Sequence, residues 1–204
     1  MSTNPPGSPP NPKDNIVLWL AYLVWVISKH FSLGYWLLKF LTKVHDRSGL
    51  RNQFYGSYVL GWLLVLVAVL IFAPTSGLWG LAFGALALYR LQDLLLGSIG
   101  DALEFHEFTG TWQVRTVQAI ANLIQVVVIF AIVFLVFTTS KSFSPTEPPG
   151  RLGHFYLSWS CLPLLGSGFM AQTSGAMCLV MIESAAGVLL VVIALSRFLA
   201  GQKS

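Results

Sequence analysis

Two long apolar runs, Val117–Phe137 and Ala176–Ala200, constrain the fold of this chain more than any other feature. At a rise of 1.5 Å per residue, a helix over either run is long enough to cross the roughly 30 Å hydrocarbon core of a bilayer. Two shorter runs, Gly56–Ala73 and Leu78–Leu96, lie near the lower limit and are joined by a turn at 74–77. Charged residues make up only 10% of the chain, against about a quarter in soluble domains. We therefore expect an all-α membrane protein with four transmembrane helices.

The N-terminal quarter is more ambiguous. Residues 1–15 are rich in Pro, Ser and Asn and are expected to be disordered, without the features of a signal peptide. Residues 16–55 are apolar but are interrupted by Lys29, and further on aromatic residues are mixed with Lys39 and Lys43. That mixture suits an amphipathic helical segment lying in the membrane interface. A tilted span with a snorkelling lysine is the alternative.

Basic residues set the expected topology. They precede the first and third spans and follow the last one: Lys29, Lys39, Lys43, Arg47, Arg51, Arg115, Arg197 and Lys203. By the positive-inside rule these ends are cytoplasmic. Four spans then place both termini inside, with a transmembrane hairpin over 56–98 and a cytoplasmic linker over 99–116. We expect a multi-pass protein of the plasma (inner) membrane.

Two charged residues fall within the second short run. Arg90 and Asp93 are three residues apart and can pair on one face of a helix. A structural ion pair is favoured over a voltage sensor, because a sensor repeats arginine at every third position.

The chain from His154 onward carries an ordered set of features. A short aromatic segment over 154–163 contains Tyr156 and Trp159, whose rings could wedge it against neighbouring helices. A small apolar loop with two glycines follows. A long apolar helix over 175–200 comes next, for which Thr173 or Ser174 can supply the N-cap.

This order of short helix, glycine loop and long helix resembles the pore module of the potassium-channel superfamily, including its prokaryotic two-transmembrane members. The resemblance covers about residues 117–200. It implies a pore domain over 117–204, with an outer helix (117–138), a pore helix (154–163), a filter (164–169) and an inner helix (175–200). Because the motif occurs once, the resemblance implies a homotetramer around one central pore.

The resemblance assigns the selectivity filter to Leu164, Leu165, Gly166, Ser167, Gly168 and Phe169. The family reads T-x-T-T-V-G-Y-G-D here, and the two glycines are in place, which allows consecutive carbonyls to face one axis. Leu164 replaces a threonine that supplies hydroxyl ligands, Ser167 replaces the tyrosine that braces the loop, and Phe169 replaces the aspartate at the mouth. The departures predict weaker discrimination between potassium and sodium.

Glu183 and Gly187 form an E-x-x-x-G pattern in the inner helix, which prokaryotic members of the family often show. Gly187 is either a gating hinge or a site of close helix packing. An acid within an apolar span is a functional or pairing site by default. For Glu183 a hydrogen bond to the filter scaffold or to a neighbouring helix is favoured over contact with ions.

The predicted function is passive conduction of a monovalent cation, potassium or sodium, and not an enzymatic one. The expected partners are other copies of the chain and the lipid bilayer, with no nucleic acid, no cofactor and no metal beyond the permeant ions. One alternative is a non-selective or poorly conducting pore-like protein, or an auxiliary subunit. A small membrane transporter or enzyme is a further alternative, although such proteins usually place more polar residues in their spans.

Overall fold

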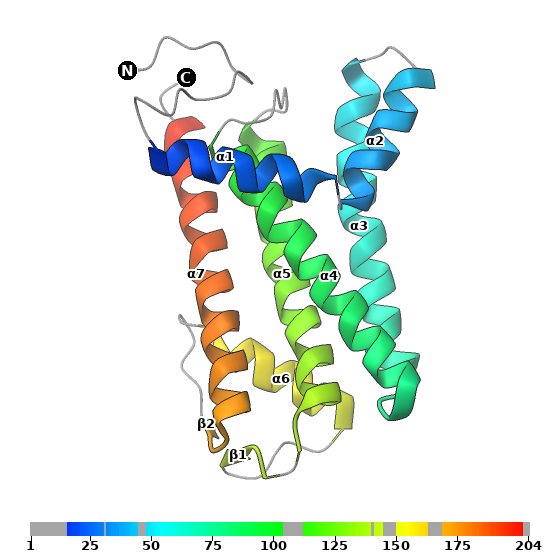
Figure 1. The fold of residues 1–204 in the computed structure, drawn as a ribbon, viewed down its shortest axis with the longest axis vertical. Coiled ribbons are helices and arrows are strands. Elements are labelled where there is room, and N and C mark those ends of the chain that lie inside the picture. The colour runs from blue at the N-terminus through cyan, green and yellow to red at the C-terminus, as the bar shows by residue number, and fades with distance from the viewer. Residues whose placement is uncertain are drawn as a thin grey trace.

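The computed structural model describes residues 16–30, 32–44, 48–103, 112–139, 141–144, 150–162 and 169–201. This part of the chain is mostly helical (Figure 1). Its elements, in chain order, are α1 (Ile16–Lys29), α2 (Leu33–Val44), α3 (Ser48–Phe72), α4 (Gly77–Ala102), α5 (Trp112–Phe137), β1 (Phe143–Ser144), α6 (Gly150–Cys161), β2 (Met170–Ala171) and α7 (Ser174–Gly201).

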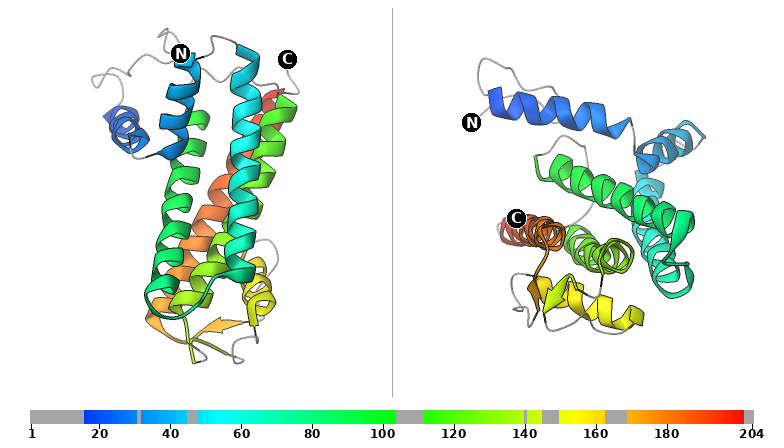
Figure 2. Two further views of the ribbon diagram at one scale, coloured as in Figure 1. Left: turned by 90° about the vertical axis from the view of Figure 1, so that its right-hand side faces the viewer. Right: turned by 60° about the horizontal axis from the view of Figure 1, so that its bottom comes forward.

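Four long helices, α3, α4, α5 and α7, run along the long axis of the molecule (Figures 1 and 2). Helix α1 lies across one end of them, and α2 lies beside the first part of α3. Helix α6 and the two short strands lie at the other end. The strands pair antiparallel, with Phe143 opposite Ala171 and Ser144 opposite Met170.

Helix α5 is the centre of the bundle. It contacts α3, α4, α6 and α7, and every residue from Val126 to Phe134 is at most 2% exposed. A helix that is apolar on all sides is stable where it is surrounded, and the run of Val, Ile, Phe, Ala and Leu in α5 meets that condition.

Two helices are long and apolar enough to cross a membrane, over Thr116–Phe137 in α5 and Ser174–Ser196 in α7. They coincide with the two long runs predicted from sequence. Gly56–Phe72 in α3 and Ile16–Ile27 in α1 are shorter apolar helical segments.

Several helices extend beyond the apolar runs that predicted them. Helix α3 begins at Ser48 instead of Gly56, α4 continues to Ala102, and α5 begins at Trp112. Helices α4 and α5 thus extend into both ends of the segment 99–116 that was predicted as a linker, and residues 104–111 lie outside the described residues. Hydropathy marks the part of a helix that faces lipid or the core, whereas the helix itself continues through polar turns at either end.

The predicted segment over 16–55 is two helices and the start of α3 rather than one element. Helix α1, with 14 residues, is about 21 Å long and crosses α4. At this crossing the Trp25 side chain packs directly on Gly100 of α4. A Cβ atom on Gly100 would lie 2.1 Å from the indole nitrogen, so only glycine fits there without a shift. The outer face of α1 carries the exposed residues Ile16, Val17, Leu20, Val24 and Ile27.

The turn between α3 and α4 depends on Gly77, whose φ is +69°. Gly77→Ala is expected to lower the unfolding free energy by about 1 kcal/mol, because a Cβ atom disfavours the left-handed conformation. Gly97 in the interior of α4 is the matched control, since it has the same open surroundings and no positive φ. Gly97→Ala is expected to stabilise by about 0.5–1 kcal/mol. Denaturant titrations in mixed micelles that shift both variants in the same direction would contradict this reading.

Candidate functional site

Helix α6 reaches far into the bundle. The side chain of Ser158, in its last turns, contacts Val127 on α5 and Glu183 on α7. Val127 lies ten residues before the end of α5, about 15 Å along a helix at 1.5 Å per residue. Glu183 lies nine residues into α7, roughly 14 Å by the same rise. The C-terminal half of α6 therefore meets both long helices well inside their length.

Ser158, Val127 and Glu183 form a small buried polar cluster surrounded by apolar side chains. The Ser158 hydroxyl lies 2.8 Å from the carbonyl oxygen of Val127 and hydrogen-bonds Oε1 of Glu183. All three residues are fully buried. The other carboxyl oxygen, Oε2, has no hydrogen-bond partner among the described residues. Glu183 thus has a hydrogen bond to a neighbouring helix, one of the two contacts that were favoured from sequence.

A second bond joins the same two helices one step along. Ser184 on α7 donates from Oγ to the carbonyl oxygen of Cys161 at the C-terminus of α6, at 3.2 Å. Helix ends leave their last carbonyls without partners inside the helix, so this hydroxyl satisfies one of them and holds the end of α6 against α7.

The N-terminus of α6 is tied to a different part of the bundle. Arg151 donates from Nη1 to the carbonyl oxygen of Leu70 and from Nη2 to that of Ala73, both at 2.7 Å. These carbonyls end α3, where unpaired oxygens and the helix dipole favour a cation. Helix α6 begins at Gly150 (φ +76°) and not at His154 as predicted, and this contact holds its first turn against the end of α3.

The predicted filter falls largely outside the described residues, which omit 163–168 and therefore Leu164, Leu165, Gly166, Ser167 and Gly168. Phe169 is described and half-buried, and its ring meets that of Tyr156 on α6 edge-on, with centroids 6.2 Å apart. Beyond it, β2 pairs with β1 close to the end of α5.

The sequence suggested that two aromatic residues of α6 wedge it against neighbouring helices. Within this chain they do not. Tyr156 and Trp159 are 60% and 43% exposed, and Leu157 and Ser158 fill the buried face instead. The helix places these positions on opposite sides, and the hydropathy of a short helix does not reveal which side faces inward.

Two further predictions concern α7. Thr173 is its N-cap, since its Oγ1 accepts from the backbone nitrogen of Ala176 at 3.3 Å. Gly187 is buried in the interior of α7, which continues as one helix from Ser174 to Gly201.

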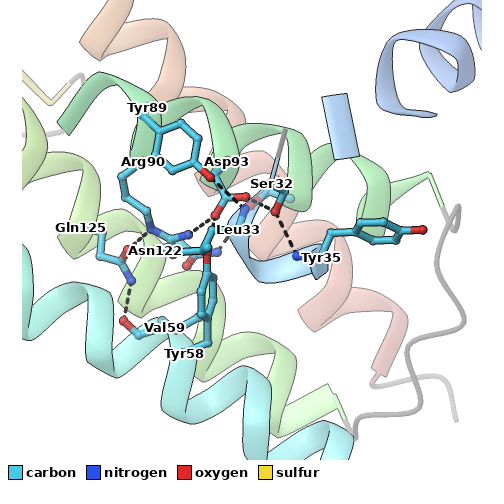
Figure 3. Close-up of polar contacts among 11 residues, drawn as sticks. Ser32, Leu33, Tyr35, Tyr58, Val59, Tyr89, Arg90, Asp93, Asn122 and Gln125 are labelled. Atoms are coloured by element: carbon cyan, nitrogen blue, oxygen red, sulfur yellow. Dashed lines mark hydrogen bonds and ion pairs between the residues drawn. The ribbon is translucent and has the colours of Figure 1, made fainter. Parts of the chain in front are cut away.

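A second polar cluster lies between α3, α4 and α5, away from α6 (Figure 3). Arg90 pairs with Asp93 on the same face of α4, as predicted. Its Nε also donates to Gln125 Oε1 on α5 at 2.9 Å, and Gln125 donates to the carbonyl oxygen of Val59 on α3 at 3.0 Å. The guanidinium carbon lies 5.1 Å from the ring centroid of Tyr58, a distance typical of cation–π contacts.

Asp93 is the acceptor that collects the remaining donors of this cluster. It accepts from Ser32, at the corner between α1 and α2, and from the Tyr58 hydroxyl at 2.9 Å. The neighbouring Tyr89 hydroxyl accepts from the backbone nitrogen of Leu33 at 2.8 Å. The cluster thus links the α1–α2 corner to α3, α4 and α5, and its charges are balanced internally, which suits a structural role.

Sequence reasoning did not identify Ser158, Arg151, Gln125 or Ser32. Single serines and glutamines carry no spacing signal. Only Arg151 could have been suspected, as a cation shortly before the predicted pore helix.

No family model matches this chain, and neither the curated proteins nor the solved structures contain a match to it.

Proposed function

We propose that this chain is one subunit of a tetrameric cation channel, in which α5, α6 and α7 form a quarter of the pore domain. The observation that carries the proposal is the depth of α6. Its C-terminal half meets Val127 and Glu183 well inside the long helices, as we expect for a re-entrant pore helix.

The path of the chain on both sides of residues 163–168 supports this reading. Helix α6 starts at the α3–α4 turn, through the bonds of Arg151, and its C-terminal half lies against α5 and α7, at Val127 and Glu183. After residues 163–168, the chain returns at β2 to the end of the bundle where α6 begins, and β2 pairs there with β1. The Gly-Ser-Gly sequence lies between these two points. The carbonyl end of α6 carries the negative end of the helix dipole, which favours a cation.

The distribution of basic residues supports an orientation. Helix α1, the start of α5 and the end of α7 lie at one end of the bundle (Figure 1). These parts of the helices contain Lys29, Arg115 and Arg197. By the positive-inside rule that end is cytoplasmic, with α3, α4, α5 and α7 as four spans, both termini inside and α1 in the interface. Helix α6 then enters from the outside.

The outer face of α7 supports assembly from several copies. Helix α7 exposes a long apolar stripe, formed by Met181, Ile182, Val188, Val192, Leu195 and Leu199. In the proposed homotetramer this helix is the inner helix, and its stripe faces the axis and the neighbouring subunits.

The filter sequence favours a second candidate, a pore-like protein that conducts poorly or without selectivity. Phe169 places an apolar ring beside Tyr156 at the position where the family carries an aspartate. The ring of negative charge that concentrates cations at a pore mouth is thereby lost.

The purified protein in lipid nanodiscs and liposomes tests the proposal. A fourfold particle is expected, and cysteines placed at Lys141, which is exposed, and at Ser204 should be labelled from opposite sides of the membrane. Labelling from the same side, or a stable monomer, would contradict the proposal.

Reversal potentials under bi-ionic potassium and sodium then separate the two candidates. Native protein is expected to discriminate weakly between potassium and sodium. The double variant Leu164→Thr with Ser167→Tyr restores the threonine and tyrosine of the family motif and is expected to discriminate better. A gain of 1.4 kcal/mol between the two ions corresponds to about tenfold in selectivity. A fourfold particle without current in either form would favour the non-conducting candidate.

A further inference from the structure

The contact between Ser158 and Glu183 fixes the location of a proton. The Ser158 oxygen lies within hydrogen-bond distance of two acceptors, the Val127 carbonyl oxygen and Oε1 of Glu183. A hydroxyl has one hydrogen to donate, and a backbone carbonyl can only accept. If the hydroxyl donates to Glu183, the oxygens of Ser158 and Val127 face each other at 2.8 Å with no hydrogen between them. If it donates to Val127, the hydrogen of the second contact must come from the carboxyl group.

The surroundings of the carboxyl group favour the second arrangement. Glu183 is fully buried, and its Oε2 has no partner among the described residues. An ionised carboxylate has room for about four hydrogen bonds and is costly to bury without a compensating charge. Arg90–Asp93 is the one ion pair within the described ranges, and it belongs to the other polar cluster.

The elements packed against α7 bring no cation to this carboxyl group. These elements are α4, α5, α6 and β2, and between Thr116 and Phe137 α5 has no titratable side chain. Arg151 is bound to the end of α3, and His154 Nδ1 lies 2.8 Å from the carbonyl oxygen of Gly150. The remaining titratable residues on the described parts of these elements are Tyr89, Arg90, Asp93 and Asp101 on α4, Tyr156 and Cys161 on α6, and Cys178 and Arg197 on α7 itself. Arg197 lies 14 residues beyond Glu183, roughly 21 Å along a helix.

We propose that Glu183 is a protonated carboxylic acid and that its proton holds α6 in place. The carboxyl O–H donates to Ser158, and the Ser158 O–H donates to the Val127 carbonyl, so one chain of hydrogen bonds runs from α7 through α6 to α5. When the proton is lost to water, the Ser158 hydrogen turns to the carboxylate. The Val127 carbonyl then loses its bond to α6, and the deep end of α6 is released from α5. The effect of this release on conduction rests on the channel function proposed above.

Infrared difference spectra test the protonation without requiring conduction. Native protein in lipid at neutral pH is expected to show the C=O stretching band of a protonated carboxylic acid, and Glu183→Gln is expected to lack it. Absence of this difference would show that Glu183 is ionised and would overturn the proposal.

Hydrogen exchange of α6, followed by mass spectrometry, tests the release. At alkaline pH the backbone amides of α6 are expected to exchange faster in native protein than in Glu183→Gln at the same pH, because the neutral amide donates to Ser158 without losing a proton. Ser158→Ala is expected to exchange fast at every pH. Ser160→Ala is the matched control, since Ser160 is also buried in α6 but, among the described residues, bonds only the Leu157 carbonyl of its own helix. Equal exchange in native protein and Glu183→Gln over the whole alkaline range would overturn the release.

Cation flux into liposomes links the release to the proposed channel. Native flux is expected to fall about tenfold for each pH unit once the acid titrates, as for any single protonated group, while Glu183→Gln keeps its flux. If the flux stays constant at a pH where hydrogen exchange shows that α6 is released, the release does not control conduction, and that part of the proposal would be overturned. No flux in any variant, with the infrared and exchange results as expected, would contradict the channel and leave the proton-held contact established.

Discussion

Asp93→Ala is expected to lower the unfolding free energy by about 3–5 kcal/mol, the usual cost of removing one partner from a buried ion pair. Asp93 accepts hydrogen bonds from Arg90, Tyr58 and Ser32, and Arg90 is only 3% exposed. Without the carboxylate, the guanidinium keeps Gln125 as a partner but loses its counter-charge. The α1–α2 corner also loses the bond of Ser32, so α1 is expected to detach from α4 first.

The measurement is equilibrium unfolding of reconstituted protein by a denaturing detergent, followed by circular dichroism. The double variant Arg90→Met with Asp93→Leu is the matched control, because it removes both charges and keeps most of the volume. It is expected to be close to native in stability or above it, as replacements of buried ion pairs by apolar residues often are. A loss below about 1 kcal/mol in Asp93→Ala would show that Arg90 is solvated in the native protein, since exposed pairs contribute no more than that.

Arg151→Ala is expected to cost about 3 kcal/mol, since a hydrogen bond from a charged group contributes about 1.5–3 kcal/mol and two such bonds to a partly exposed side chain are lost. The guanidinium of Arg151 joins the N-terminus of α6 to the last carbonyls of α3, at Leu70 and Ala73. Among the described residues, these two hydrogen bonds attach α6 to the α3–α4 hairpin. Their loss should therefore loosen α6 as well as lower stability.

Arg151→Lys and Leu152→Ala complete this experiment. A lysine is a point donor and cannot match the two-pronged geometry of arginine, so about half of the stability should return. Leu152 is 84% exposed, and its truncation should change the unfolding free energy by less than about 0.5 kcal/mol. A lysine variant as stable as the native protein would mean that charge at the end of α3 matters and the two directed bonds do not.

The pattern of apolar residues was sufficient to predict the long helices. The runs that cover α5 and α7 are continuous, and an apolar run of that length has few conformations that satisfy its backbone in lipid or in a core. Pairing of Arg90 with Asp93 and capping by Thr173 were also predictable, because both depend on residues three positions apart in one helix. Boundaries were less predictable, as the early start of α3 at Ser48 shows.

Contacts between elements could not be read from the chain. The sequence singled out Glu183 as an acid in an apolar span, but its partner Ser158 is a single serine 25 positions away and carries no periodic signal. Likewise, Arg151 meets carbonyls about 80 positions earlier, and backbone carbonyls are the same at every residue. Local pattern determined which segments are helices and which side chains are unusual. Only packing decided that α5 is central, that α6 lies against both α5 and α7, and which polar groups meet, because each of those contacts depends on the relative placement of segments far apart in the chain.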